Sequence, residues 1–178
     1  MLAAVRCQFA RADVVFVVDS SRTICGGDSR CANFGTILSF VNDIIRQLNV
    51  GQDNTRIGFV RYSSPSATSN EFYLNDQYDR TRVQNAVTGV QYNTGRANVA
   101  DLVNALEVAR TQQFVSTRGD RLGAPNIIVV LTNTGIQPDS PTVSLQSFIT
   151  SRFTYIIHYS ILCLLITIIL NSPQGGQV

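Results

Sequence analysis

Residues 12–23 read ADVVFVVDSSRT, and this stretch decides the fold. An apolar run rich in β-branched valine ends abruptly at Asp19, and hydroxyl side chains follow at Ser21 and Thr23. A short apolar run bounded by polar residues predicts a strand buried on both faces, central in a parallel sheet. Ligand sites in such sheets lie just beyond the carboxyl ends of the strands. The three side chains are therefore candidate ligands for a cation that prefers hard oxygen, such as Mg²⁺, Ca²⁺ or Mn²⁺.

The segments that follow predict helices alternating with strands. Residues 33–48 carry apolar side chains at helical spacing and predict an amphipathic helix. A polar turn at 51–55 leads into residues 56–64, whose alternating pattern predicts a strand. Residues 100–113 predict a further helix with a polar face. Strands that alternate with helices indicate an α/β fold of three layers.

These motifs resemble the von Willebrand factor A-type domain, in its matrilin-like and collagen VI-like forms. Residues 19–23 match the family's Asp-x-Ser-x-Ser/Thr signature, and residues 56–63 match its Arg-x-Gly-x-Val-x-Tyr-Ser strand. Residues 123–132 are similar to its central strand. The similarity covers roughly residues 10–135. It implies a three-layer sandwich, in which helices cover both faces of a Rossmann-like, mostly parallel sheet.

The resemblance also implies a metal-ion-dependent adhesion site for Mg²⁺ or Mn²⁺. Its first loop is intact and supplies three ligands, Asp19, Ser21 and Thr23. The family's second-loop threonine falls on Ala97, next to which Asn98 is a candidate metal or rim residue. Asn133 takes the place of the family's third-loop aspartate. The loss of a carboxylate and a hydroxyl predicts a weakened, degenerate site. The alternative for residues 19–21 is a turn that caps the following helix.

Cysteine usage suggests an oxidising compartment. Cys25 and Cys31 flank a glycine-containing loop just after the candidate ligands. In a family that is usually exported we expect them to form a disulfide that stiffens the rim of the site, with two free thiols as the alternative. Cys7 would then be left for a partner outside this segment, and Cys163 lies in an apolar run as a small buried side chain.

The resemblance ends before the chain does. We expect a partial A-type domain at residues 8–152, incomplete at its C-terminus, and then an apolar segment with a Pro/Gly-rich tail at 153–178. Residues 155–170 allow three interpretations: a membrane helix, a strand in which residues 153–160 take a vacant position in the sheet, or a misjoined end of the gene model. The run is short of the roughly 20 residues that a membrane helix needs and long for one strand, which favours the misjoined end.

A tripeptide, Arg118-Gly119-Asp120, lies in a polar loop that we expect at the surface. Arg-Gly-Asp is a candidate integrin-recognition motif. Related domains carry similar residues before this strand as a solvated turn, which is the alternative.

No enzyme is predicted. His158 is the only histidine, and neither a Gly-x-Ser-x-Gly elbow nor a phosphate-binding loop with Lys is found. The net charge of +2 does not indicate nucleic acid or an anionic membrane as a partner. We expect a secreted adhesion module of the extracellular matrix, with collagens or other A-domain ligands as partners. A metal-independent structural module and a membrane-tethered receptor fragment are the alternatives.

Overall fold

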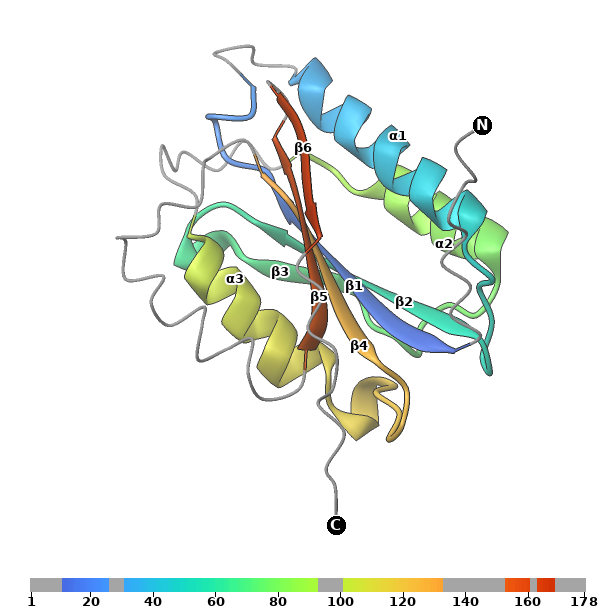
Figure 1. The fold of residues 1–178 in the computed structure, drawn as a ribbon. Helices are drawn as coiled ribbons and strands as arrows, with labels where there is room; N and C mark the ends of the chain where they lie inside the picture. The colour runs from blue at the N-terminus through green and yellow to red at the C-terminus, as the bar shows by residue number, and fades with distance from the viewer. Residues whose placement is uncertain (1–10, 26–30, 93–100, 133–152, 161–162, 169–178) are drawn as a thin grey trace.

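The computed structural model describes residues 11–25, 31–92, 101–132, 153–160 and 163–168, which form a sheet with helices on both faces (Figure 1). The sheet has six strands in the order β3-β2-β1-β4-β5-β6. The inner four are parallel: β1 (Ala12–Asp19), β2 (Thr55–Tyr62), β4 (Asn126–Leu131) and β5 (Phe153–Ser160). The edge strands are antiparallel to their neighbours: β3 (Ser69–Phe72) and β6 (Cys163–Ile168). The predicted α/β class with a mostly parallel sheet is confirmed.

Two helices cover one face of the sheet and one covers the other (Figure 1). The first pair is α1 (Ala32–Gln47) and α2 (Arg80–Gly89). On the other face α3 (Leu102–Val108) continues into a π-helical turn, η2 (Ala109–Gln113). Short 3₁₀ turns follow β2 and η2: η1 (Pro65–Ala67) and η3 (Ser116–Arg118). The predicted helices at 33–48 and 100–113 therefore form with small shifts at their ends.

Strand β1 is the centre of the core because all eight of its residues are buried. Successive side chains of a strand point to opposite faces of the sheet. Val14, Phe16 and Val18 accordingly pack with the apolar stripe of α1. Val15 and Val17 pack with α3 on the opposite face. Burial on both faces explains why the sequence of β1 is a continuous apolar run.

The apolar segment near the C-terminus forms two strands, of which β5 pairs with β4 and β6 pairs with β5. The expectation that this run is long for one strand agrees with the structure, in which the chain divides it in two. Of the three interpretations of this segment, the structure shows the strand at residues 153–160. No helix within the described ranges is long and apolar enough to cross a membrane.

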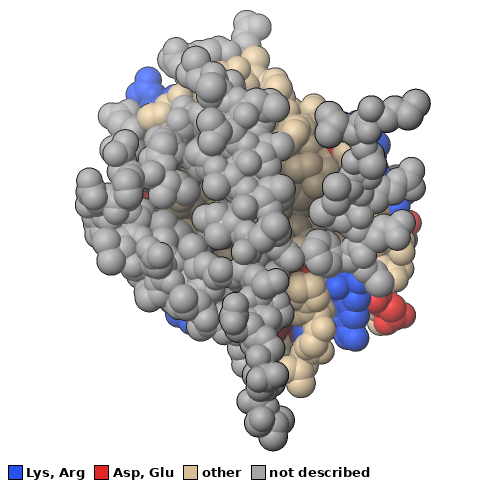
Figure 2. Space-filling model, in the orientation of Figure 1, with Lys and Arg blue, Asp and Glu red and all other residues tan. Residues whose placement is uncertain are grey.

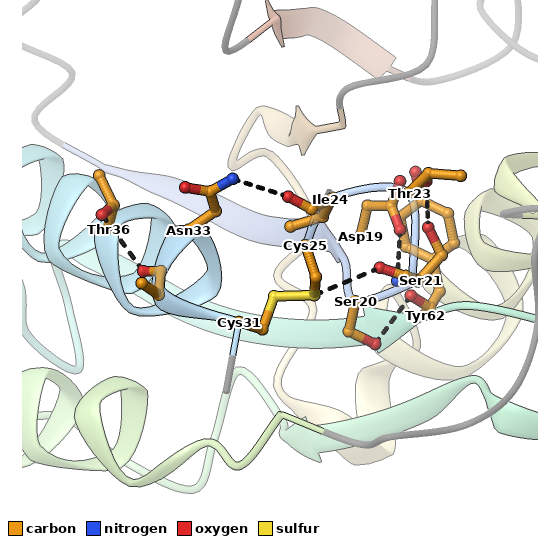
Figure 3. The surroundings of a disulfide bond; sticks show 11 residues. Asp19, Ser20, Ser21, Thr23, Ile24, Cys25, Cys31, Asn33, Thr36 and Tyr62 are labelled. Atoms are coloured by element: carbon orange, nitrogen blue, oxygen red, sulfur yellow. Dashed lines mark hydrogen bonds between the residues drawn. A yellow bond between two sulfur atoms is a disulfide. The ribbon is translucent and has the colours of Figure 1, made fainter. Parts of the chain in front are cut away.

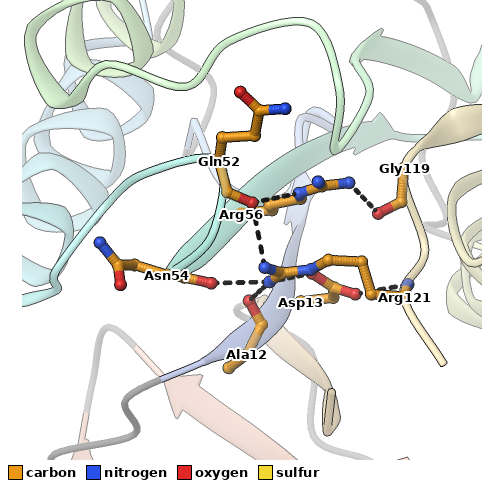
Figure 4. A network of polar contacts seen from close by, with 7 residues as sticks. All are labelled: Ala12, Asp13, Gln52, Asn54, Arg56, Gly119 and Arg121. Atoms are coloured by element: carbon orange, nitrogen blue, oxygen red, sulfur yellow. Dashed lines mark hydrogen bonds and ion pairs between the residues drawn. The ribbon is translucent and has the colours of Figure 1, made fainter. Parts of the chain in front are cut away.

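A buried ion pair joins the amino end of β1 to the loop before β4 (Figure 4). Asp13 is fully buried, and the Arg121 side chain is 7% exposed. One carboxylate oxygen of Asp13 accepts from Nε and Nη2 of Arg121, at 2.9 and 2.6 Å, and the other accepts from the backbone N–H of Arg121 at 2.8 Å. The same guanidinium also donates to backbone carbonyls of Ala12, Gln52 and Asn54. One side chain thus connects β1, the loop before β2 and the loop before β4.

The surface pairs are of a different kind. Arg46 and Asp43, three residues apart on α1, form an ion pair in which both side chains are more than half exposed. Basic and acidic side chains also lie next to each other at the lower right of Figure 2. Exposed pairs of this kind contribute at most about 1 kcal/mol. The Asp13–Arg121 pair differs from these because both of its side chains are buried.

We predict that Asp13→Ala lowers the free energy of unfolding by about 3–5 kcal/mol, because Arg121 is left buried without its counter-charge. Urea denaturation at neutral pH measures the change. Asp43→Ala is the matched control, since it removes one carboxylate from an exposed pair and should change stability by about 0.5 kcal/mol or less. Equal, small losses in the two variants would contradict a structural role for the buried pair.

Candidate metal centre

The carboxyl ends of three adjacent parallel strands bring Asp19, Tyr62 and Thr132 together. Asp19 is the register partner of Tyr62, and Val18 is the partner of Leu131, so that Thr132 is the next residue beyond β4. Since alternate residues share a face, Asp19 projects on the side of α3, where Tyr62 also packs. The sequence predicted a site at this edge from the β1 loop together with Asn98 and Asn133. Tyr62 and Thr132 were missed, although Tyr62 lies in a predicted strand and Thr132 ends the stretch that resembles the family's central strand.

Asp19 is fully buried and accepts hydrogen bonds on both oxygens. Oδ1 accepts from the backbone N–H of Ser21 at 2.8 Å, and Oδ2 accepts from the Thr132 hydroxyl at 3.1 Å. Burial raises the pKa of Asp19 above its ordinary value, while these hydrogen bonds act in the opposite direction. The site therefore holds a carboxylate whose negative charge is poorly solvated.

The loop after Asp19 presents two more oxygens (Figure 3). The hydroxyls of Ser21 and Thr23 are 2.6 Å apart and share a hydrogen bond. Ser20 anchors the loop to β2, because its hydroxyl and its backbone N–H both donate to the carbonyl of Tyr62, at 3.0 and 2.7 Å. Ser20 thus anchors the loop, and the neighbouring Ser21 and Thr23 are the two candidate ligands.

A second carboxylate lies near the same edge of the sheet. Asp101 begins α3, where its side chain accepts from the backbone N–H of Asn104 at 2.9 Å and its own N–H donates to the carbonyl of Ser63 at 2.8 Å. The pKa of Tyr62 is raised, chiefly by burial and further by the charges of Asp19 and Asp101. The phenol therefore remains a neutral hydroxyl in the field of two acidic side chains. Asp101 lies in the predicted helix at 100–113, and the sequence did not single it out as a candidate ligand.

The donors that the structure describes fit a divalent cation that prefers oxygen. Asp19 supplies the charge, and the hydroxyls of Ser21 and Thr23 supply neutral ligands on the same turn. Within the described residues no group of three or more His, Cys, Asp or Glu side chains is placed to hold a metal, so such a site relies on hydroxyls. Asn98 and Asn133 lie outside the described residues, and their roles stay predictions.

A disulfide joins Cys25 to Cys31 beside this loop (Figure 3). Both cysteines are buried, and Cys31 directly precedes α1. The cross-link therefore connects the segment that carries Ser21 and Thr23 to the helix on one face of the sheet.

The Arg-Gly-Asp tripeptide lies at the other end of the sheet, and only part of it is at the surface. The Arg118 guanidinium stacks on the ring of Tyr73, 4.1 Å from its centroid. Gly119 is buried with φ 99°, and a Cβ there would lie 2.8 Å from the backbone N of Asn75. Its carbonyl accepts from Arg56 at 2.8 Å (Figure 4), and Asp120 is half-buried. These contacts hold the tripeptide against the domain and do not favour integrin recognition.

The chain matches the family model of the von Willebrand factor type A domain over residues 13–157, and it belongs to this family. Matrilin-2 of Mus musculus is 31% identical over 128 residues, which cover 71% of this chain and 13% of matrilin-2. The collagen alpha-5(VI) chain of Homo sapiens is 28% identical over 133 residues, which cover 75% of this chain and 5% of the collagen chain. The chain thus spans a small part of the length of these relatives. Its family is one of non-enzymatic matrix and adhesion modules.

Solved structures share the fold. Proximal thread matrix protein 1 from the mussel byssus, with a zinc-occupied MIDAS motif, has a TM-score of 0.67 at 18% identity, covering 84% of this chain and 37% of that chain. The manganese-loaded TRAP protein of Plasmodium vivax has a TM-score of 0.66 at 15% identity, covering 85% of this chain and 58% of that chain. At these identities the likeness shows the fold alone.

We predict that the free energy of unfolding of the metal-free wild type falls relative to that of Asp19→Asn as pH rises. Because the folded-state pKa of Asp19 lies above its unfolded value, the stability that the carboxyl contributes is fully present below the unfolded pKa. It is lost as pH rises through the raised folded pKa, whereas the amide does not titrate. Denaturation in a chelator at about pH 3.5 and pH 7 measures the difference.

The exposed Asp43→Asn variant is the control for this pH series, because its carboxylate lies on the surface of α1. If the wild type instead became more stable relative to Asp19→Asn as pH rises, the assignment of a desolvated carboxylate would be contradicted.

Proposed function

We propose that this domain is an extracellular adhesion module that binds protein partners through a weak divalent-cation site at the carboxyl ends of β1, β2 and β4. The observation that carries the proposal is the buried carboxylate of Asp19 beside the paired hydroxyls of Ser21 and Thr23. Hard oxygen donors of this kind suit Mg²⁺ or Mn²⁺. A bound cation would supply a Lewis-acidic position to which an acidic side chain of a partner coordinates.

Different residues would have different roles in such a site. Asp19 would balance most of the cation's charge, and its position is held by Thr132 and by the backbone of Ser21. Ser21 and Thr23 would bind the cation directly, and Ser20 holds the turn on β2. Asn133 and Asn98 would add neutral oxygens in place of the family's charged and hydroxyl ligands. Fewer charged ligands mean lower affinity, so we expect a weakened site.

The relatives suggest the setting in which the module works. Matrilin-2 and a collagen VI chain contain regions similar to this chain. We therefore propose secretion into the extracellular matrix, with collagens or other ligands of A-type domains as partners.

A second candidate function is a structural matrix module that needs no metal. It is favoured by the hydrogen bonds of Asp19, since both of its oxygens have protein donors without an ion. The substitutions Ala97 and Asn133 also favour it, because neither retains the family's ligand.

We predict that calorimetric titration of Mn²⁺ or Mg²⁺ into the folded domain gives saturable binding with a dissociation constant on the order of millimolar. Asp19→Ala should abolish this binding, because it removes the buried charge. Asp43→Ala should leave it unchanged, because that carboxylate lies on an exposed helix face.

The same protein is then applied to collagen-coated surfaces with and without chelator. Cation binding together with chelator-sensitive adhesion would support the proposed function. An isotherm for the wild type no different from that of Asp19→Ala would leave the metal-independent module as the better account.

A further inference from the structure

The segment that carries two of the candidate ligands is anchored to the sheet at its start. At its start, Ser20 bonds to β2 and Asp19 belongs to the sheet. Beyond Ser21 the backbone makes two tight turns, in which Ile24 N–H donates to the carbonyl of Ser21 at 3.2 Å and Cys25 N–H donates to that of Arg22 at 3.1 Å. These bonds are local, so they shape the segment without fixing it against the rest of the domain.

The far end of the segment is linked to α1 by two bonds (Figure 3), and the side chain of Ile24 is buried in the same core cluster as the apolar stripe of α1. The first is the disulfide from Cys25 to Cys31. The second is a hydrogen bond from Nδ2 of Asn33 to the carbonyl of Ile24 at 2.9 Å. Helix α1 is in turn held by its buried stripe, in which Phe34 and Ile37 lie in the core.

The disulfide touches the ligand loop directly. Cys25 Sγ lies 3.8 Å from the carbonyl oxygen of Ser21, and Cys25 is 6% exposed. Its partner Cys31 is 2% exposed and adopts φ 47°, a left-handed conformation that a non-glycine residue rarely takes. A conformation of this kind persists where surrounding contacts determine it. The cross-link and the first turn of α1 provide those contacts, since the Cys31 carbonyl accepts from Phe34 N–H at 3.0 Å.

We propose that the Cys25–Cys31 disulfide is a positioning element for the cation site, which holds Ser21 and Thr23 in place by tying their loop to α1. This inference rests on the proposed function. The cysteines do not contact the cation; they limit the conformations of the loop that does. Groups that orient metal ligands without touching the metal typically change affinity by about 10- to 100-fold when they are removed. We expect an effect at the lower end of that range, because the Asn33 hydrogen bond and the buried side chain of Ile24 remain.

The test compares the oxidised wild type with the double variant Cys25→Ser/Cys31→Ser. Mn²⁺ affinity is measured by calorimetry, and amide hydrogen exchange is measured by NMR in metal-free protein. The double variant should bind Mn²⁺ about tenfold more weakly. The Ser21 amide, which donates to Asp19, should exchange faster, while the amides of Val15 and Val17 in the core of β1 keep their protection.

Two single variants complete the comparison. Asn33→Ala removes the second tie and should weaken Mn²⁺ binding in the same direction, which keeps the inference testable if the double variant does not fold. Thr36→Ala is the matched control, because its hydroxyl bonds within α1 to the carbonyl of Ala32 and not to the loop. It should bind Mn²⁺ as the wild type does.

The outcomes separate the inference from the function on which it rests. A folded double variant with wild-type Mn²⁺ affinity would overturn the positioning role while the cation site stands. Equal acceleration of Ser21 and of the β1 core would also overturn it, because the disulfide would then act on global stability alone. If the wild type itself fails to bind Mn²⁺, the proposed function fails, and Ser21 exchange decides the positioning role: selective acceleration supports it, and unchanged exchange refutes it.

Discussion

The unbroken parallel register of β1 with β2 and β4 is the constraint on which the rest of the structure depends. It pairs Asp19 with Tyr62 and places Thr132 one residue beyond the last pair of β1 and β4. Side chains alternate between faces, so a slip of one residue would move Asp19 to the side of α1 and away from its partners. The apolar residues of β1 exclude such a slip, because each face of the strand is already packed against a helix layer. The core thereby fixes the site.

The elements that form the core were predictable from sequence because their patterns are local. The apolar run of β1 and the helical stripe of α1 each indicate one structure and one set of buried faces. Three of the candidate ligands follow from the same stretch, since Asp19, Ser21 and Thr23 come directly after the strand. Long-range partners carry no such signal. Arg121 is 108 residues from Asp13, and nothing near either residue indicates that the two charges meet.

Other features became interpretable only with neighbouring elements in place. Gly58 belongs to a strand motif, and the structure shows why a glycine stands at this position. A Cβ here would lie 2.4 Å from Gln113 Oε1. Gln113 is fully buried and donates to the Phe72 carbonyl at 3.0 Å, although the sequence predicted a polar helix face in its region. The segment at 153–168 was likewise ambiguous, because a short apolar run does not distinguish a strand from a helix by periodicity. The pairing of β5 with β4 shows that its first part is a strand.

A buried carboxylate lies at each end of β1, and the two differ in whether their charge is balanced. This contrast bears on the function of the site. Asp13 faces a guanidinium that neutralises its charge. Asp19 is equally buried but has only neutral donors, the N–H of Ser21 and the hydroxyl of Thr132, and no ion pair within the described ranges includes it. Neutral donors stabilise a carboxylate without balancing its charge, so burial remains costly. An arginine beside Asp19 would balance its charge, as Arg121 balances that of Asp13. The proposed cation site would use this unbalanced charge, whereas the charge of Asp13 is already balanced by Arg121.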